Sequence, residues 1–234
     1  MRSYISMRLL IFLLTGTLPL TACAAGPPAT YSAESIEAWV MDEETNQPLA
    51  GVIVVAHWEL FGGMHTDVVG PLMVMETVTD AQGRFFFPAW GPKKRPQGFL
   101  WYADPTLLLF KSGYDFEHIS NEVTERPDPS PVRRSEWNRK TIRLKKFTGS
   151  LEKYADHVGR FDSSDLVFAF RFHDCSWKQI PRMLVAMDQE NQRFKKQLAR
   201  DLAEYPASIE ERERDKSDLA KCGSIQEFLR SYMP

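Results

Sequence analysis

Between Ser35 and Phe147 the chain repeats one pattern: a short apolar, β-branched or aromatic run, then a turn rich in Gly, Pro, Asp or Asn. The strongest run is GVIVVAHWEL, in which Val54 faces one side of a strand and Val55 the other. Many short strands separated by turns are typical of an antiparallel β-sandwich. The other predicted strands lie within residues 35–41, 72–80, 83–90, 106–120 and 138–147.

Turn residues and two longer segments organise these strands. Asp80 can accept a turn amide and Gly83 can adopt a positive φ, which predicts a hairpin between the flanking strands. Residues 91–105 hold an aromatic cluster beside three basic residues, and residues 121–137 are polar and proline-rich. Both segments are predicted as insertions, the second as a long surface loop.

After Phe147 the pattern becomes helical. An apolar stripe at three- and four-residue steps predicts a long helix with Pro181 in its first turn. The charged segment 207–223 predicts its continuation to Gly223, and Ser224 with Glu227 has capping-box spacing. The stripe consists of Ile180, Leu184, Met187, Phe194, Leu198, Leu202 and Tyr205.

The N-terminus has the pattern of an export signal. Arg2 and Arg8 flank a polar start, and the apolar stretch Leu9–Leu20 is shorter than the ~20 residues of a membrane span. The residues LTAC, which end at Cys23, resemble the lipobox of bacterial lipoproteins. The resemblance implies cleavage before Cys23 and a diacylglycerol on its thiol, hence a membrane anchor. The alternative is an ordinary signal peptide with a chance cysteine.

Residues 23–34 are small, polar and proline-containing, which predicts a tether. Ala24 occupies the position where Asp often means inner-membrane retention in Gram-negative lipoproteins. The resemblance therefore implies an outer-membrane protein that faces the periplasm.

Three segments, MDEETNQPLAGVIVVA, ETVTDAQGRFFF and LLLFKSGYDF, share an ordered set of residues with one family. They resemble the carboxypeptidase regulatory-like domain, a transthyretin-like, Ig-like sandwich, over Ser35–Leu144. The resemblance implies that Phe85 and Phe87 enter the core and that Tyr114 packs on the sheet, but it does not imply an activity. The matching residues are Thr45, Pro48, Leu49, Gly51, Val52, Thr79, Asp80, Gly83, Phe85, Gly113 and Tyr114.

Charge and motif content narrow the function. Lys plus Arg (29) nearly balances Asp plus Glu (31), so no basic field is present to attract nucleic acid. The five histidines show no zinc-ligand spacing, and the acidic turn at Asp42 is predicted to be solvated rather than calcium-binding. No phosphate loop or G-x-S-x-G motif is present, and the ending LRSYMP lacks the Tyr-Arg-Gly-Ser motif of transthyretin-like purine-pathway hydrolases. The sequence predicts no catalytic residue, metal or cofactor.

Two sets of residues remain as candidate features. Cys175 and Cys222 are expected to form a disulfide in an oxidising compartment, the alternative being two buried free thiols. Phe99, Trp101 and Tyr102 are candidates to contact a glycan or a protein, because aromatic rings stack on sugars and anchor interfaces. Alternatively, these rings cover an open end of the sandwich.

The predicted organisation is a lipoprotein signal peptide (1–22), a tether (23–34), a β-sandwich domain (35–147) and a helical C-terminal region (148–234). The predicted function is a non-catalytic, membrane-anchored envelope lipoprotein that acts as a structural or interaction module for a protein or glycan partner. Alternatives are a carbohydrate- or peptidoglycan-binding module and an accessory lipoprotein of a secretion assembly. A third alternative, a hydrolase, requires a cluster of partly buried His, Asp or Glu side chains.

Overall fold

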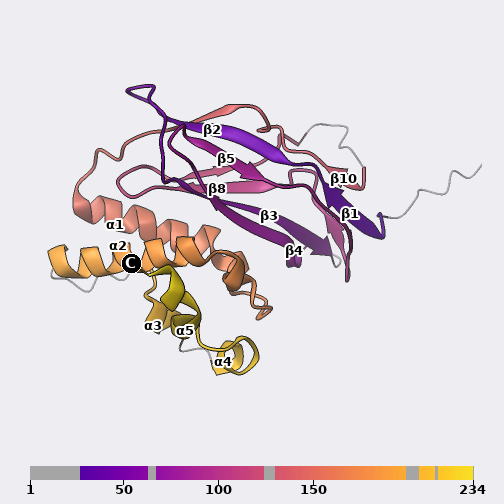
Figure 1. Cartoon of the computed structure of the whole chain (residues 1–234). Helices are drawn as coiled ribbons and strands as arrows, with labels where there is room; N and C mark the ends of the chain where they lie inside the picture. Colours follow the sequence, from indigo (N-terminus) through magenta and orange to yellow (C-terminus); the bar gives the residue numbers. More distant parts are fainter. Residues whose placement is uncertain (1–26, 63–66, 124–129, 199–205, 214–215, 234) are drawn as a thin grey trace, which may run out of the picture.

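The strands and helices follow the predicted order, a β-sandwich and then a helical region (Figure 1). The computed structural model describes residues 27–62, 67–123, 130–198, 206–213 and 216–233, so the predicted signal peptide and Cys23 lie outside the described residues. The strands are β1 (Thr30–Ala33), β2 (Ile36–Asp42), β3 (Ile53–Gly62), β4 (Asp67–Val78), β5 (Arg84–Phe87), β6 (Trp90–Lys94), β7 (Phe99–Leu100), β8 (Thr106–Phe110), β9 (Glu117–Ile119), β10 (Val132–Arg133) and β11 (Thr141–Leu144). The helical segments are α1 (Leu151–Arg160), η1 (Phe161–Asp165), η2 (Val167–Ala169), η3 (Ser176–Gln179), α2 (Pro181–Leu198), α3 (Ile209–Arg212), α4 (Lys216–Cys222), α5 (Ile225–Leu229) and η4 (Arg230–Tyr232).

Two small sheets face a larger one across an apolar core. The small sheets have the strand orders β10-β1-β6 and β11-β2-β5, and the large sheet has the order β4-β3-β8-β9, with β7 also paired to β3. Most pairings are antiparallel, which agrees with the predicted mainly β sandwich. Two are parallel, β10 with β1 and β11 with β2. These two pairings are parallel because late strands return beside early ones in the same direction.

Strand β3 is buried on both faces. Val54 and Ala56 belong to the core between the sheets, whereas Val55 belongs to a second core shared with the helices. A strand covered on both sides has a nearly continuous apolar run rather than strict alternation, as in the segment GVIVVA. The prediction that Val54 and Val55 face opposite sides is confirmed. Helices α1 and α2 lie along the outer face of the large sheet (Figure 1).

The turn at Asp80 forms, but it does not close a hairpin. The Asp80 carboxylate accepts the amides of Gln82 and Arg84, both at 2.9 Å, and Gly83 has a φ of +70°. A Cβ at Gly83 would lie 2.4 Å from the Val40 carbonyl oxygen, so glycine is required there. Strand β4 pairs with β3 and β5 pairs with β2, so the predicted hairpin is wrong. Turn residues fix the local chain direction, while burial of Phe85 and Phe87 selects the other sheet.

The tether and the insertions contain more regular structure than predicted. Thr30–Ala33 pairs with both β6 and β10 and buries Tyr31, so the predicted tether is interrupted by a strand. Two apolar residues between polar neighbours were too weak a pattern to reveal β1. The 91–105 insertion supplies most of β6 and all of β7, and the 121–137 segment supplies β10.

The helical region begins as predicted and then departs from the prediction. Helix α2 has Pro181 as its first residue and is described as far as Leu198; Leu202 and Tyr205 lie outside the described residues. The charged segment does not continue α2 as one helix. Residues 206–208 are not helical, and Ser208 caps the start of a new helix, α3, through a capping box with Glu211. Helix α4 follows separately and ends before Gly223.

Buried carboxylates of α2 and η1 hold this segment in place. Asp188 accepts the amide of Ile209 at 3.0 Å, and Asp162 accepts the amide of Ala207 at 2.9 Å. Asp162 also pairs with the Arg212 guanidinium.

Ser224 caps α5 by accepting the Glu227 amide at 3.0 Å, as its spacing predicts. No helix in the described part of the chain combines the length and apolar character needed to cross a bilayer.

The acidic turn is organised by a buried carboxylate rather than a solvated one. Asp42 is 3% exposed and accepts the amides of Thr45 and Glu44 at 2.8 and 3.0 Å. The Tyr114 hydroxyl donates to it at 2.8 Å. The Thr45 amide and then this hydroxyl are the main causes that lower the pKa of Asp42 to about 2. Tyr114 packs against the sandwich core, as the family pattern implies.

Candidate functional site

Four aromatic side chains gather at one end of the sandwich, and we call them the aromatic end: Phe61, Phe99, Trp101 and Tyr102. Phe99 of β7 pairs with Phe61 of β3. The Trp101 ring lies 5.5 Å from the Phe61 ring and 5.8 Å from the Tyr102 ring, measured between centroids. All four side chains are partly exposed. The structure thus brings together the three predicted contact residues and adds Phe61.

Backbone and charge hold the aromatic end in place. Gly98 has a φ of +64°, and a Cβ there would lie 2.3 Å from the Phe61 carbonyl oxygen, so only glycine lets the insertion approach β3 this closely. The buried guanidinium of Arg133 donates to the Leu100 carbonyl at 3.0 Å and lies 5.8 Å from the centre of the Tyr102 ring. The rings are therefore presented on fixed backbone.

Asp104 connects this surface to the neighbouring part of β3. Its side chain is buried, with the residue 4% exposed, and burial raises its pKa well above the ordinary value. The Glu59 amide donates to its carboxylate and partly offsets this effect. A buried carboxyl group thus lies between the aromatic end and Glu59.

Next to the aromatic end lies an acid–histidine cluster, defined by His57, Glu59, His118 and Asp165. His57 and Glu59 are alternate residues of β3, and His57 Nδ1 lies 3.9 Å from the Glu59 carboxylate. His118, on β9, forms an ion pair through Nδ1 with Asp165, the last residue of η1. The His57 imidazole stacks on the Phe168 ring with centroids 4.3 Å apart. The cluster lies where the large sheet meets the segment after α1.

The pKa values of His57, Glu59 and His118 are shifted by different causes. His57 is 5% exposed, and neither ring nitrogen has a hydrogen-bond partner among the described residues. Burial, with a smaller effect from His118, lowers the pKa of His57 to about 3, so its imidazole is neutral at pH 7. Burial raises the pKa of Glu59, while the hydrogen bond to Asp165 raises that of His118.

This arrangement can move protons at its surface side. The His118 side chain is 49% exposed and that of Glu59 is 20% exposed, so solvent reaches both. A histidine oriented by a carboxylate, close to a second carboxyl group with a raised pKa, is an arrangement that general acid–base catalysis uses. Within the ranges that the structure describes, no group of three or more His, Cys, Asp or Glu side chains is placed to hold a metal ion.

Sequence reasoning considered the histidines only for zinc spacing and missed this cluster. His57 and Glu59 stand two apart in a predicted strand, a spacing that puts both on one face. That signal was present, but nothing in the sequence connects them with His118 or Asp165. The cluster of partly buried His, Asp and Glu side chains that a hydrolase requires is therefore present in the structure.

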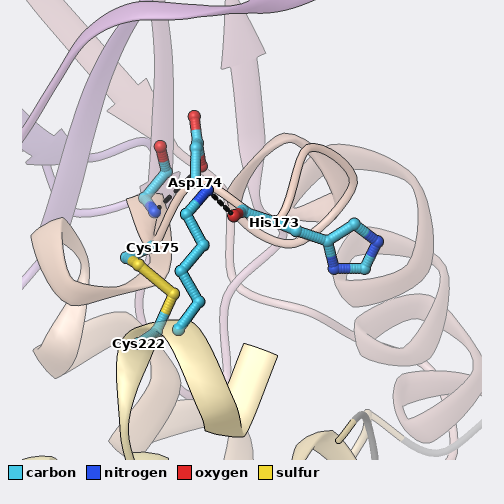
Figure 2. The surroundings of a disulfide bond; sticks show 6 residues. His173, Asp174, Cys175 and Cys222 are labelled. Carbon is cyan, nitrogen blue, oxygen red and sulfur yellow. Dashed lines mark hydrogen bonds between the residues drawn. A yellow bond between two sulfur atoms is a disulfide. The ribbon is translucent and has the colours of Figure 1, made fainter. Parts of the chain in front are cut away.

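The predicted pairing of Cys175 with Cys222 is confirmed by a disulfide with a Cα–Cα distance of 5.5 Å. Figure 2 shows the bond joining the helix that ends at Cys222 to the loop at Cys175, with the His173 imidazole turned away. Nearby, the Lys221 ammonium donates to the His173 carbonyl at 2.7 Å, and the Asp174 carboxylate accepts an amide at 3.0 Å. The disulfide fastens the C-terminal helices to the segment before α2.

Comparison with known proteins assigns no family. No protein-family model matches the chain, and no curated protein matches it. Among solved structures, 3-chlorocatechol 1,2-dioxygenase from Rhodococcus opacus 1CP aligns with 15% identity and a TM-score of 0.31, over 50% of this chain and 61% of that one. A streptococcal ancillary pilin aligns with 13% identity and a TM-score of 0.26, over 50% of this chain and 30% of the pilin.

A third structure, BcpA, the major pilin subunit of Bacillus cereus, aligns with 15% identity and a TM-score of 0.23, over 51% of this chain and 31% of BcpA. The chain spans less than two thirds of the length of each of these three proteins. Such scores do not carry a functional argument, so the fold class stated above comes from the structure of this chain itself.

Proposed function

We propose that this protein is a lipid-anchored module of the bacterial cell envelope that acts by binding a partner rather than by catalysis. The observation that carries the location is the Cys175–Cys222 disulfide, because disulfides persist in oxidising spaces such as the periplasm. The export pattern of residues 1–22 and the lipobox at Cys23 support the same location, and Ala24 favours the outer membrane.

The sandwich, which we assign to the carboxypeptidase regulatory-like class on its sequence pattern, serves as the scaffold for the aromatic end. Trp101 and Tyr102 are partly exposed and held by the backbone contacts at Gly98 and Arg133. Rigid aromatic side chains contribute large contact area at little entropic cost, and they anchor protein partners or stack on sugars. We therefore propose that the aromatic end contacts an envelope protein or a glycan.

The anchoring proposal is tested at Cys23. The wild-type protein, expressed in bacteria supplied with an alkyne analogue of palmitate, is expected to incorporate the label, whereas the Cys23→Ser variant should incorporate none because serine lacks the thiol. Ala24→Ser, which keeps the thiol, is the matched control and should label normally. A wild-type protein without label, or with residues 1–22 still attached by mass spectrometry, contradicts the anchor.

The binding proposal is tested at Trp101. Purified cell-wall sacculi and a detergent extract of envelope proteins are used as probes, and retention of the protein on each is measured. Trp101→Ala is expected to reduce retention on one of them at least tenfold, a loss of about 1.4 kcal/mol or more. The matched control is Trp39→Ala, another partly exposed tryptophan, on β2. If Trp101→Ala only lowers the melting temperature and leaves retention unchanged, the rings serve packing alone.

A hydrolase is a second candidate, and the acid–histidine cluster is the observation that favours it. His118, oriented by Asp165, would act as general base, and Glu59, with its raised pKa, as general acid. The test is turnover of chromogenic ester and glycoside substrates. The hydrolase candidate requires that His118→Asn abolish turnover while the protein still unfolds at its original temperature. A wild-type protein without turnover of either substrate class removes it.

A further inference from the structure

Strand β4 is an edge strand with a regular, unpaired outer side. It pairs only with β3, and from Met73 to Val78 that pairing runs without a register shift. The shifts occur earlier, opposite Trp58–Phe61, where bulges protect the edge. In the described part of the chain, no backbone-to-backbone hydrogen bond joins β4 to any element other than β3. Over these six residues, the backbone N–H and C=O groups of alternate residues point away from β3 and have no backbone partner in the part of the chain that the structure describes.

This edge lines a groove rather than a flat surface. Two cavities, of about 320 and 460 Å³, adjoin along β4 and share Met73, Val74 and Gln179. The other lining residues come from β6, the disulfide loop, η3, the first turn of α2 and η4. We call this space the β4 groove. An extended segment of six residues spans about 20 Å, and it can bind an unpaired edge by adding a strand.

The charges that line the β4 groove are unequal. Its cations are Lys93, Lys178 and Arg182, and its acids are Asp174 and Glu76. Both acids already accept internal amides: Asp174 from Ser176, and Glu76 from the first turn of α2 at 2.8 and 3.0 Å.

The lysines, in contrast, have no carboxylate within ion-pair distance among the described residues. Lys93 contacts the Met73 sulfur at 3.8 Å, and Lys178 lies 5.4 Å from the centre of the Trp177 ring. Partly exposed Met73 and Met75 add an adaptable apolar surface. The groove is therefore complementary to an extended segment that carries both acidic and apolar side chains.

We propose that the β4 groove binds an acidic, extended segment of a partner protein, which adds a strand to the outer edge of β4 at Met73–Val78. A second copy of this chain is disfavoured as occupant, because pairing of two β4 edges would place two surfaces with the same excess of cations against each other. The proposal names a partner class for the binding role proposed above, on a surface separate from the aromatic end. Its failure therefore leaves the anchoring and Trp101 tests unaffected.

The test uses the mature full-length protein in detergent and a fluorescent hexapeptide of alternating Glu and Val. Fluorescence anisotropy is expected to show saturable binding. The same peptide N-methylated at alternate residues keeps its charge but cannot form a ladder, so it should bind at least tenfold more weakly. Hydrogen exchange should slow at Met73–Val78 when the unmethylated peptide is bound. Trp101→Ala should bind the peptide as the wild type does.

Charge reversal provides the second arm. The double variant Lys93→Glu/Lys178→Glu is expected to lose the acidic peptide and bind a Lys-Val hexapeptide instead. Lys145→Glu/Lys153→Glu, which changes the net charge equally at two exposed sites outside the groove, should keep the wild-type preference. Equal binding of the methylated peptide, no binding of either peptide, or a wild-type dimer whose formation protects Met73–Val78 would overturn the proposal.

Discussion

Reduction of the Cys175–Cys222 disulfide is expected to lower the free energy of unfolding by about 4 kcal/mol, as the chain-entropy relation gives for this loop. The bond joins residues 47 positions apart, so it removes many conformations from the unfolded chain. It also ties α4 and α5 to the segment before α2. Among the described side chains of these two short helices, those of Cys222, Ile225 and Leu229 are buried. Guanidinium unfolding followed by circular dichroism, with and without reductant, measures the difference.

The location of the change sharpens this test. Hydrogen exchange in the reduced protein should accelerate first at residues 216–233, before β3 and β8 open, because these helices then depend on their local contacts. The Cys175→Ser and Cys222→Ser single variants should each match the reduced wild type, since either removes the same bond. Unfolding midpoints that are equal with and without reductant contradict the expected stabilisation.

The sequence predicted the fold where local chemistry and burial agree. The alternation of Val54 and Val55, the start of α2 at Pro181 and the Ser224 cap all depend on neighbours within a few positions. The predictions that were wrong depended on partners far along the chain. Strand β1 forms because it pairs with β6 and β10 on its two sides. The turn at Asp80 leads from one sheet to another because β5 pairs with β2 instead of β4.

The same distinction holds for the candidate sites. Phe99, Trp101 and Tyr102 are close in sequence, so their proximity was predictable, whereas Phe61 joins them only through the β3–β7 pairing. The acid–histidine cluster joins β3, β9 and η1, and no spacing in the sequence encodes that meeting. The cysteine pair was predictable despite its long separation. Cys23 is assigned to the lipobox, so Cys175 and Cys222 are the two cysteines left to pair in an oxidising compartment.

His57→Phe is expected to stabilise the protein in acid. Relative to its effect at pH 7.5, the substitution should raise the free energy of unfolding by about 2 kcal/mol at pH 5. The folded pKa of His57 is about 3, whereas the unfolded imidazole titrates near 6.5. As the pH falls below 6.5, His57 therefore becomes protonated in the unfolded state but stays neutral in the folded state. Each pH unit between 6.5 and 3 costs up to about 1.4 kcal/mol of stability. Phenylalanine keeps the stacking on Phe168 and removes this proton site.

The measurement is the difference in unfolding free energy between variant and wild type at pH 7.5, 6, 5 and 4. Taking the difference cancels the contributions of the other titratable groups, which both proteins share. The difference should grow steadily as pH falls. His157→Phe is the matched control: burial also lowers the pKa of His157, but its side chain is 21% exposed and Asp115 opposes the shift, so the growth should be smaller. If His57→Phe is instead destabilising at every pH, the lowered pKa of His57 does not limit the stability of the protein in acid.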